Sequence, residues 1–210
     1  MNKRWKNRPE GSTWGDFGHD DQVGRINLLT PERRLEAVKE VKAGISFCLS
    51  LPLDYPGGNS VNPKRFPPVL KPTLHSDNSH YYNLRWRDYH SGFEDVSSDD
   101  SVLLHTQYST QWDSLGHAGA LFDADDDGFE EIVYYNGWRG GKHIKGPTDV
   151  EDSDQSGSAK AERLGIENMA ATCVQGRGVL IDLHQHFGDE RVSVGFDDLE
   201  RVMKQDGVVV

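Results

Sequence analysis

Apolar side chains recur at helical spacing in three stretches of the chain. Residues 31–42 follow Thr30, a residue type that caps helices well, and begin with Pro31, which suits the first helical turn. Residues 166–174 and 196–205 carry apolar side chains three and four positions apart, as on one face of a helix. We therefore expect a helix in each of these stretches.

Other stretches show runs or alternation of apolar side chains that are typical of strands. The predicted strands are residues 45–51, 80–86, 102–113, 132–135 and 178–183. The last is a continuous apolar run, which predicts a buried central strand. Residues 54–79 are rich in proline and glycine and long enough to form an ordered binding loop or lid. Since no internal repeat or domain boundary is evident, we expect a single α/β domain over residues 1–210.

The charge of the chain excludes several classes of partner. It has 23 Lys and Arg against 34 Asp and Glu, a formal net charge of −11. An acidic chain lacks the basic face of nucleic-acid binders and is not attracted to anionic membranes. No apolar run is long enough for a transmembrane helix, and no signal peptide is evident. Cys48 and Cys173 are both expected to be buried, and two distant cysteines indicate a reducing, cytoplasmic compartment.

One predicted strand carries a row of polar side chains. Alternation along residues 102–113 places five of them on one face: His105, Gln107, Ser109, Gln111 and Asp113. His117 follows four residues later, after a short turn. This row could hold a metal or a polarised water. The alternative is a strand whose polar face meets solvent, with Leu104 and Trp112 packing into the core on the other side.

This stretch resembles the metal-binding signature HxGTHxDxxxH of the cyclase family, which includes kynurenine formamidase and isatin hydrolase. The two motif histidines fall on Gln107 and Gln111, the aspartate falls on Asp113, and the last histidine falls on His117. Five other segments resemble the longer members of the family, in the same order along the chain. They are residues 14–24, 27–33, 51–53, 135–137 and 176–182.

The resemblance implies a swivelling β/β/α fold and a metal-dependent hydrolase similar to the arylformamidases of tryptophan catabolism. In that family a divalent metal, Mn or Zn, activates a water that attacks the carbonyl of a small amide, formamide or lactam substrate and cleaves its C–N bond. Carried over to this chain, Gln107, Gln111 and Asp113 hold the metal and His117 transfers the proton. The family also implies a homodimer or a larger homo-oligomer.

Two departures from the family pattern change this picture. Glutamine amide oxygens are weaker ligands than imidazoles and suit hard cations. Gln107 and Gln111 therefore favour Mn or Mg over Zn, or hydrogen bonds to the substrate. A further His and Glu of the family site lie beyond the segment that resembles residues 196–210, so we expect the C-terminal part of the family domain to be missing. The alternative hypothesis is a catalytically inactive, truncated or binding-only member of the family.

Other clusters have simpler interpretations. Residues 123–128 match the first half of a calcium-binding EF-hand loop, but position twelve is Tyr134 instead of Glu, which favours an acidic surface turn. His184 and His186 share one face after the predicted strand 178–183, and solvent exposure is the simpler interpretation of this pair. His19 lies in a tryptophan-rich N-terminal segment that is expected to shape the pocket.

Overall fold

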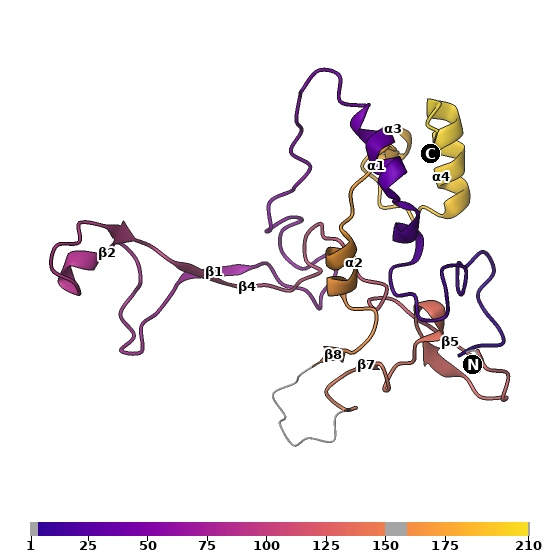
Figure 1. Cartoon of the computed structure of the whole chain (residues 1–210), viewed down its shortest axis with the longest axis horizontal. Coiled ribbons are helices and arrows are strands. Elements are labelled where there is room, and N and C mark those ends of the chain that lie inside the picture. Colours follow the sequence, from indigo (N-terminus) through magenta and orange to yellow (C-terminus); the bar gives the residue numbers. More distant parts are fainter. Residues whose placement is uncertain (1–3, 150–158, 210) are drawn as a thin grey trace. The chain divides into compact units, whose positions relative to one another are not determined.

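The computed structural model describes residues 4–149 and 159–209 of the chain. Contacts divide the chain into two compact units: unit 1 is Met1–Ile45 with Ser114–Val210, and unit 2 is Ser46–Asp113. Within the described ranges, helices occur together with small antiparallel sheets, which is consistent with the predicted α/β class (Figure 1).

The α-helices that the structure describes all lie in unit 1. They are α1 (Pro31–Val38), α2 (Ile166–Thr172), α3 (Leu183–Phe187) and α4 (Phe196–Asp206). The three predicted helices are confirmed as α1, α2 and α4, because their end signals are local. Thr30 Oγ1 accepts a hydrogen bond from Arg33 N at 3.3 Å, and Gly207 ends α4 with a left-handed φ of 65°. Across the described residues, no helix has both the length and the apolar character needed to cross a membrane.

Every described sheet is a pair of antiparallel strands. In unit 1 the pairs are β5 (Ala120–Phe122) with β6 (Glu131–Val133), and β7 (Ile144–Lys145) with β8 (Lys160–Ala161). In unit 2 they are β1 (Val69–Pro72) with β4 (Asp100–Leu103), and β2 (Leu84–Arg85) with β3 (Val96–Ser97). Short 3₁₀ turns occur at Gly24–Leu28, Trp86–Asp88 and Tyr135–Gly137.

The N-terminal segment of unit 1 packs on the β5–β6 hairpin and forms a hydrophobic core with it. The buried members are Trp5, Trp14, Ala124 and Val133, with Phe122 and Tyr135 packed against them. The backbone holds the two segments together, because Lys6 N and Asn7 N both donate to Ala124 O, at 2.7 and 2.9 Å. This packing holds the residues just after Trp5 and Trp14 in place, and their polar groups are described below.

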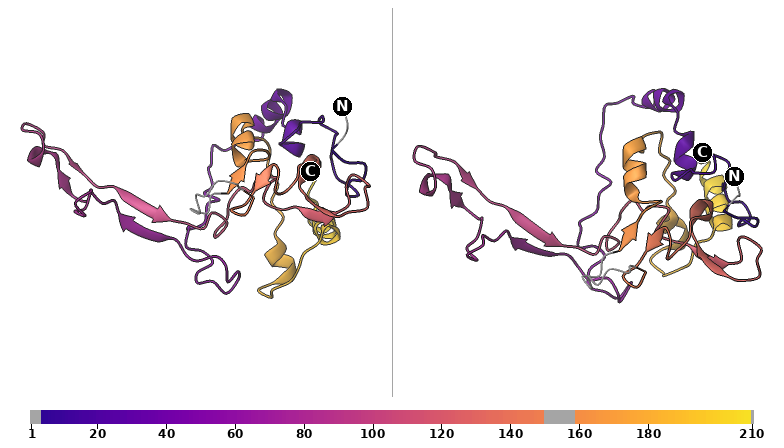
Figure 2. Two further views of the ribbon diagram at one scale, coloured as in Figure 1. Left: turned by 90° about the horizontal axis from the view of Figure 1, so that it is seen from below. Right: turned by 60° about the horizontal axis from the view of Figure 1, so that its bottom comes forward.

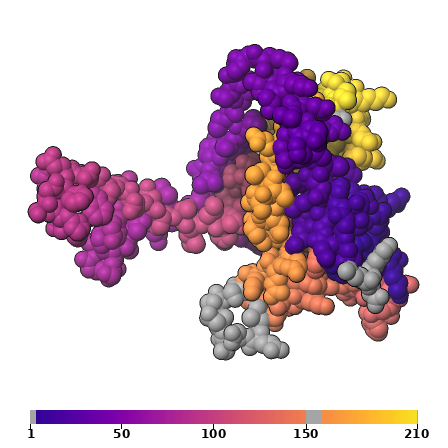
Figure 3. Space-filling view, in the orientation of Figure 1, coloured from indigo at the N-terminus to yellow at the C-terminus, as the bar shows by residue number. Residues whose placement is uncertain are grey.

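Unit 2 contains a two-stranded ribbon in which Val69 pairs with Leu103 and Pro72 with Asp100 (Figure 2). Side chains of both strands lie on the surface along almost the whole ribbon, as the space-filling view also shows (Figure 3). The strand predicted over residues 102–113, with its row of polar side chains, is not formed as a continuation of this ribbon. β4 ends at Leu103, and the prediction of a strand beyond it was wrong.

Hydrogen bonds to a neighbouring loop explain why residues 104–113 are not a strand. Arg65 Nη1 donates to Gln107 O at 2.6 Å, and Tyr108 Oη donates to Gly58 O at 2.7 Å. Ser109 Oγ donates to Pro52 O at 3.0 Å. These contacts tie residues 104–113 to Pro52 and to the proline-rich loop of the same unit instead of to a partner strand, so side chains do not alternate between two faces. Trp112 is 60% exposed, so it does not belong to a core.

The structure also corrects two other predicted strands and the prediction that both cysteines are buried. Residues 45–51 and 178–183 have no strand partner among the described residues, and Leu180 is 82% exposed. The β2 strand retains only two residues of the predicted 80–86. Cys48 and Cys173 are both exposed. Apolar composition makes a strand favourable only when another segment supplies hydrogen bonds and cover, and the described sheets supply neither here.

Candidate functional site

The three predicted metal ligands lie in unit 2. Gln111 and Asp113 are brought together, because Gln111 Nε2 donates to Asp113 Oδ2 at 3.0 Å. Gln107 lies in the turn before them, and its Oε1 accepts a hydrogen bond from Thr106 Oγ1 at 2.9 Å. Gln111 and Asp113 are exposed and Gln107 is half-buried. The amide–carboxylate contact keeps two of the predicted ligands adjacent.

The predicted proton-transfer residue, His117, belongs to unit 1, whereas Asp113 is the last residue of unit 2. His117 lies in the turn after Ser114, and its backbone N–H donates to Ser114 O at 3.1 Å. Its side chain is exposed. His117 is therefore described as part of unit 1, and the three predicted metal ligands as part of unit 2. The roles given to the four residues stay predictions.

An acidic cluster lies at the turn of the β5–β6 hairpin. One carboxylate oxygen from each of Asp123, Asp125, Asp127 and Glu131 lies within 4.8 Å of the others. The hairpin register explains the clustering, because Phe122 pairs with Glu131 and so brings both ends of the loop together. Carboxylate oxygens are the ligands that hard divalent cations prefer. The cluster can therefore hold a divalent metal.

Backbone and side-chain donors already stabilise part of this cluster. Asp123 accepts hydrogen bonds from Gly128 N at 2.9 Å and from Asp127 N at 3.1 Å. The bond from Gly128 is the main cause that lowers the pKa of the Asp123 carboxyl, so this group is ionised at neutral pH. Arg139 Nη2 forms ion pairs with Glu131 and, at 3.5 Å, with Asp125. The cluster is thus a charged site whose carboxylates Asp125 and Glu131 are already paired with Arg139.

Glu131 was not singled out from the sequence. The comparison with an EF-hand loop looked for a glutamate at position twelve and found Tyr134. The structure instead brings in the residue at position nine, the first of β6. Reading the loop as a hairpin, with its acidic residues facing across the turn, is the sequence signal that would have found Glu131.

Asn136 connects the N-terminal segment to the rest of unit 1 and is completely buried. Its Oδ1 accepts from Gly15 N at 2.9 Å. Its Nδ2 lies 3.1 Å from Gly18 O and 3.0 Å from both His19 O and Asp21 O. The backbone at Asn136 is left-handed, with φ of 57°, a conformation that Asn tolerates better than most residues. One side chain therefore holds the 15–21 loop in place.

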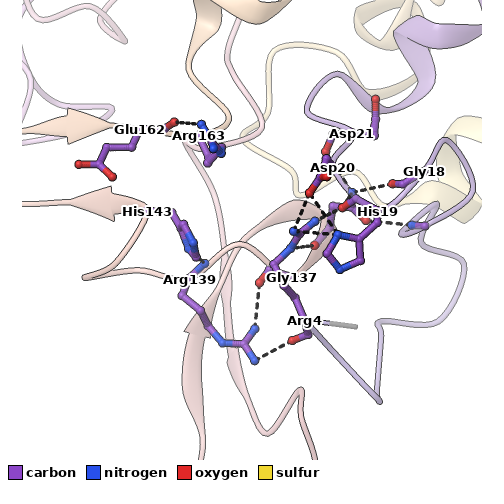
Figure 4. Close-up of polar contacts among 12 residues, drawn as sticks. Arg4, Gly18, His19, Asp20, Asp21, Gly137, Arg139, His143, Glu162 and Arg163 are labelled. Carbon is purple, nitrogen blue, oxygen red and sulfur yellow. Dashed lines mark hydrogen bonds and ion pairs between the residues drawn. The ribbon is translucent and has the colours of Figure 1, made fainter. Parts of the chain in front are cut away.

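Arg4 reinforces the same loop (Figure 4). Its Nε donates to Asn136 O and its Nη1 to Asp20 Oδ1, both at 3.1 Å, and its Nη2 donates to His19 O. Its guanidinium also lies over the Trp138 ring, 3.6 Å from the centroid. Burial lowers the pKa of Arg4, and the hydrogen bond from Arg4 is the main cause that lowers the pKa of Asp20. Both groups stay charged at neutral pH.

The His184 and His186 pair does not form a joint site. Both lie on α3, but His184 Nε2 contacts Asp189 Oδ1 at 2.8 Å, whereas His186 Nε2 contacts Asp206 Oδ1 at 2.9 Å. The second contact joins α3 to α4. Each imidazole therefore contacts its own carboxylate, and the exposed His184 and the half-buried His186 make separate contacts.

Comparison with known proteins shows a likeness to one kind of solved structure. No family model matches the chain, and no curated protein does. The chain is similar to a solved structure described as a novel cyclase, with 29% sequence identity and a TM-score of 0.63. The match covers 95% of this chain and 58% of the neighbour's chain, so this chain spans less than two thirds of the neighbour's length. The likeness supports a relationship with the cyclase family.

Proposed function

We propose that this chain belongs to a metal-dependent hydrolase of the cyclase family, which cleaves the C–N bond of a small aryl amide, formamide or lactam. The observation that carries the proposal is the likeness to a cyclase over 95% of the chain. The motif residues Gln107, Gln111, Asp113 and His117, which occupy the positions of the family signature, support it. The swivelling β/β/α fold, a cytoplasmic location and a homo-oligomeric state are parts of the same proposal.

The donor atoms of the motif fit a hard divalent cation better than zinc. Asp113 supplies a carboxylate, and Gln111 Nε2 lies 3.0 Å from it, so a half-turn of the amide would direct its oxygen toward a shared ligand. Gln107 supplies a second amide oxygen. Oxygen donors of this kind suit Mn²⁺ or Mg²⁺, whereas Zn²⁺ prefers imidazole and thiolate. A bound cation would supply the activation of a water.

The residues of the chain would then have separate roles. Asp113 provides the negative charge at the site, and Gln107 and Gln111 orient the water or the substrate through their amides. His117 accepts a proton and returns it to the leaving nitrogen. The acidic cluster of Asp123, Asp125, Asp127 and Glu131 is a second place that can hold a cation, so a test of the proposal has to separate the two.

Thermal unfolding of the metal-stripped chain with added Mn²⁺ tests the proposal. The Asp125→Asn variant weakens the acidic cluster, so any stabilisation that it retains and that also depends on Asp113 comes from the motif site. We expect Asp125→Asn to be stabilised by about 2.7 kcal/mol at a hundredfold excess of Mn²⁺ over its dissociation constant, since a ligand that binds only the folded state adds this much. The measurement is the shift in melting temperature.

The double variant Asp125→Asn with Asp113→Asn is the matched comparison. It should lose the remaining Mn²⁺ stabilisation, because its motif site no longer has a carboxylate. Equal shifts in the single and double variants would place the metal away from Asp113 and contradict the proposed site. No response in Asp125→Asn, with a response in the wild type, would assign the metal to the acidic cluster alone and favour a binding-only protein.

A further inference from the structure

A cavity of about 450 Å³ lies in the N-terminal segment of unit 1. This volume falls in the range of small-molecule sites, which are about 300–1,000 Å³. None of the motif residues or the cluster carboxylates lines it. The cavity is therefore a feature that the proposed hydrolase function does not use.

Two tryptophans give the cavity rigid aromatic walls. Trp5 and Trp14 are each 6% exposed, and their ring centroids lie 5.5 Å apart at an angle of 76°. Gly15 has a positive φ of 80°, and a Cβ built there would lie 3.1 Å from Trp5 Cζ2. The Gly15 N–H is held by Asn136 Oδ1 at 2.9 Å. The walls are thus fixed before any ligand arrives, which reduces the entropy cost of binding a flat ring.

The polar side chains of the cavity are mainly basic. Lys6 and Arg8 line it, and among the described lining residues Asp16 is the one with a carboxylate. Arg8 Nη1 donates to Trp14 O and pairs with Asp16 Oδ1 at 3.0 Å, which positions the guanidinium and leaves its other N–H groups available. A net positive lining is notable in a chain of net charge −11. It favours an anion over a cation.

His19 adds a polar atom that lacks a partner. Its Nδ1 lies 3.2 Å from Arg4 Nη1 and can accept a hydrogen bond from that guanidinium, which leaves the ring proton on Nε2. Its Nε2 is buried and has no hydrogen-bond partner among the described residues. An unsatisfied buried polar atom is costly, and His19 lines the cavity, so a turn of its ring toward a bound ligand would give Nε2 the missing partner. The His19 ring also stacks on Trp5, with 6.1 Å between centroids.

We propose that this cavity binds a small aromatic carboxylate. The ring of the ligand packs on Trp5 and Trp14, and its carboxylate pairs with Lys6 and Arg8. The His19 Nε2 atom forms the remaining hydrogen bond. A quaternary ammonium ligand also favours aromatic walls, but the lysine and arginine repel it. An inorganic anion would satisfy the charges and leave the tryptophan walls unused.

Isothermal titration with benzoate tests the proposal, with EDTA present so that neither cation site contributes. Acetate has the charge without the ring, and benzylamine has the ring with the opposite charge. We expect saturable binding of benzoate that is at least about tenfold tighter than binding of either control, since a charge-assisted hydrogen bond is worth about this factor. No binding of benzoate, or equal binding of acetate or benzylamine, would overturn the proposal.

The Lys6→Gln variant tests the location. Within the described ranges, its Nζ makes one long hydrogen bond, 3.5 Å to Asp126 O, so the variant is expected to fold, which its melting temperature checks. We expect benzoate to bind about tenfold more weakly. Arg33→Gln, on the exposed surface of α1, removes the same charge elsewhere in unit 1 and should leave binding unchanged. Equal losses in both variants, or none in Lys6→Gln, would show that benzoate does not occupy this cavity.

Discussion

Replacing Asn136 by alanine is expected to lower the free energy of unfolding by about 3 kcal/mol or more, because several buried polar groups lose their partners together. The side chain is fully buried and bonds Gly15 N and the carbonyls of Gly18, His19 and Asp21. Urea unfolding measures the change as a lower midpoint at an unchanged slope. An unchanged midpoint would contradict the role assigned to Asn136.

Two further variants separate the hydrogen bonds from the backbone strain. Asn136→Gly keeps the left-handed backbone accessible, so it should lose stability only through the missing side chain. Asn83 is a matched control, because its φ of 54° is also left-handed while its side chain is exposed. Asn83→Ala should cost about 1 kcal/mol from the backbone alone. If Asn83→Ala and Asn136→Ala cost the same, the hydrogen bonds of Asn136 contribute nothing.

The sequence predicts α1, α2 and α4 because their signals are local, and it misses the short helix α3. Thr30 and Pro31 start α1, and Gly207 ends α4, each through contacts within one turn. α1 stops at Val38, short of the predicted residue 42, because Lys39 N turns back to Glu36 O and begins a turn. The residue at which a helix ends depends on single hydrogen bonds of this kind, whereas the presence of the helix follows from the apolar pattern over its whole length.

The strands and the site depend on contacts between distant residues. The stretch from residue 104 to Asp113 has a strand-like composition, yet Arg65, Gly58 and Pro52 bond to it from a loop. No pattern in the local sequence predicts these hydrogen bonds. Asn136 is similar, because the sequence shows an ordinary Tyr-Asn-Gly turn and only the fold brings residues 15–21 against it.

The candidate residues divide in the same way. The motif positions Gln107, Gln111, Asp113 and His117 follow from a resemblance in sequence and need no contact map. The acidic cluster needs the hairpin register that pairs Phe122 with Glu131. The cavity that Trp5 and Trp14 help to line needs the packing of the N-terminal segment on β5 and β6. Sites built across a fold are therefore the part that sequence patterns miss.

Replacing His117 by alanine is expected to lower the turnover of an aryl formamide or lactam by about 10²–10⁴-fold, the usual contribution of a positioned acid–base group. The Mn²⁺ response of the melting temperature should be retained, because His117 is not among the proposed ligands. Formanilide and isatin are suitable assay substrates for the wild-type chain. The measurement is kcat with each, at saturating metal.

The strongest check is chemical rescue of the His117→Ala variant by added imidazole. Free imidazole can carry the proton that the lost side chain carried, so it should restore part of the turnover, with a dependence on the concentration of its basic form. The same addition should not affect His184→Ala, which removes an imidazole that is 73% exposed and contacts Asp189. Full turnover in His117→Ala would remove this residue from the reaction. A loss that imidazole does not rescue, accompanied by loss of the Mn²⁺ response, would assign His117 a structural or ligand role in place of proton transfer.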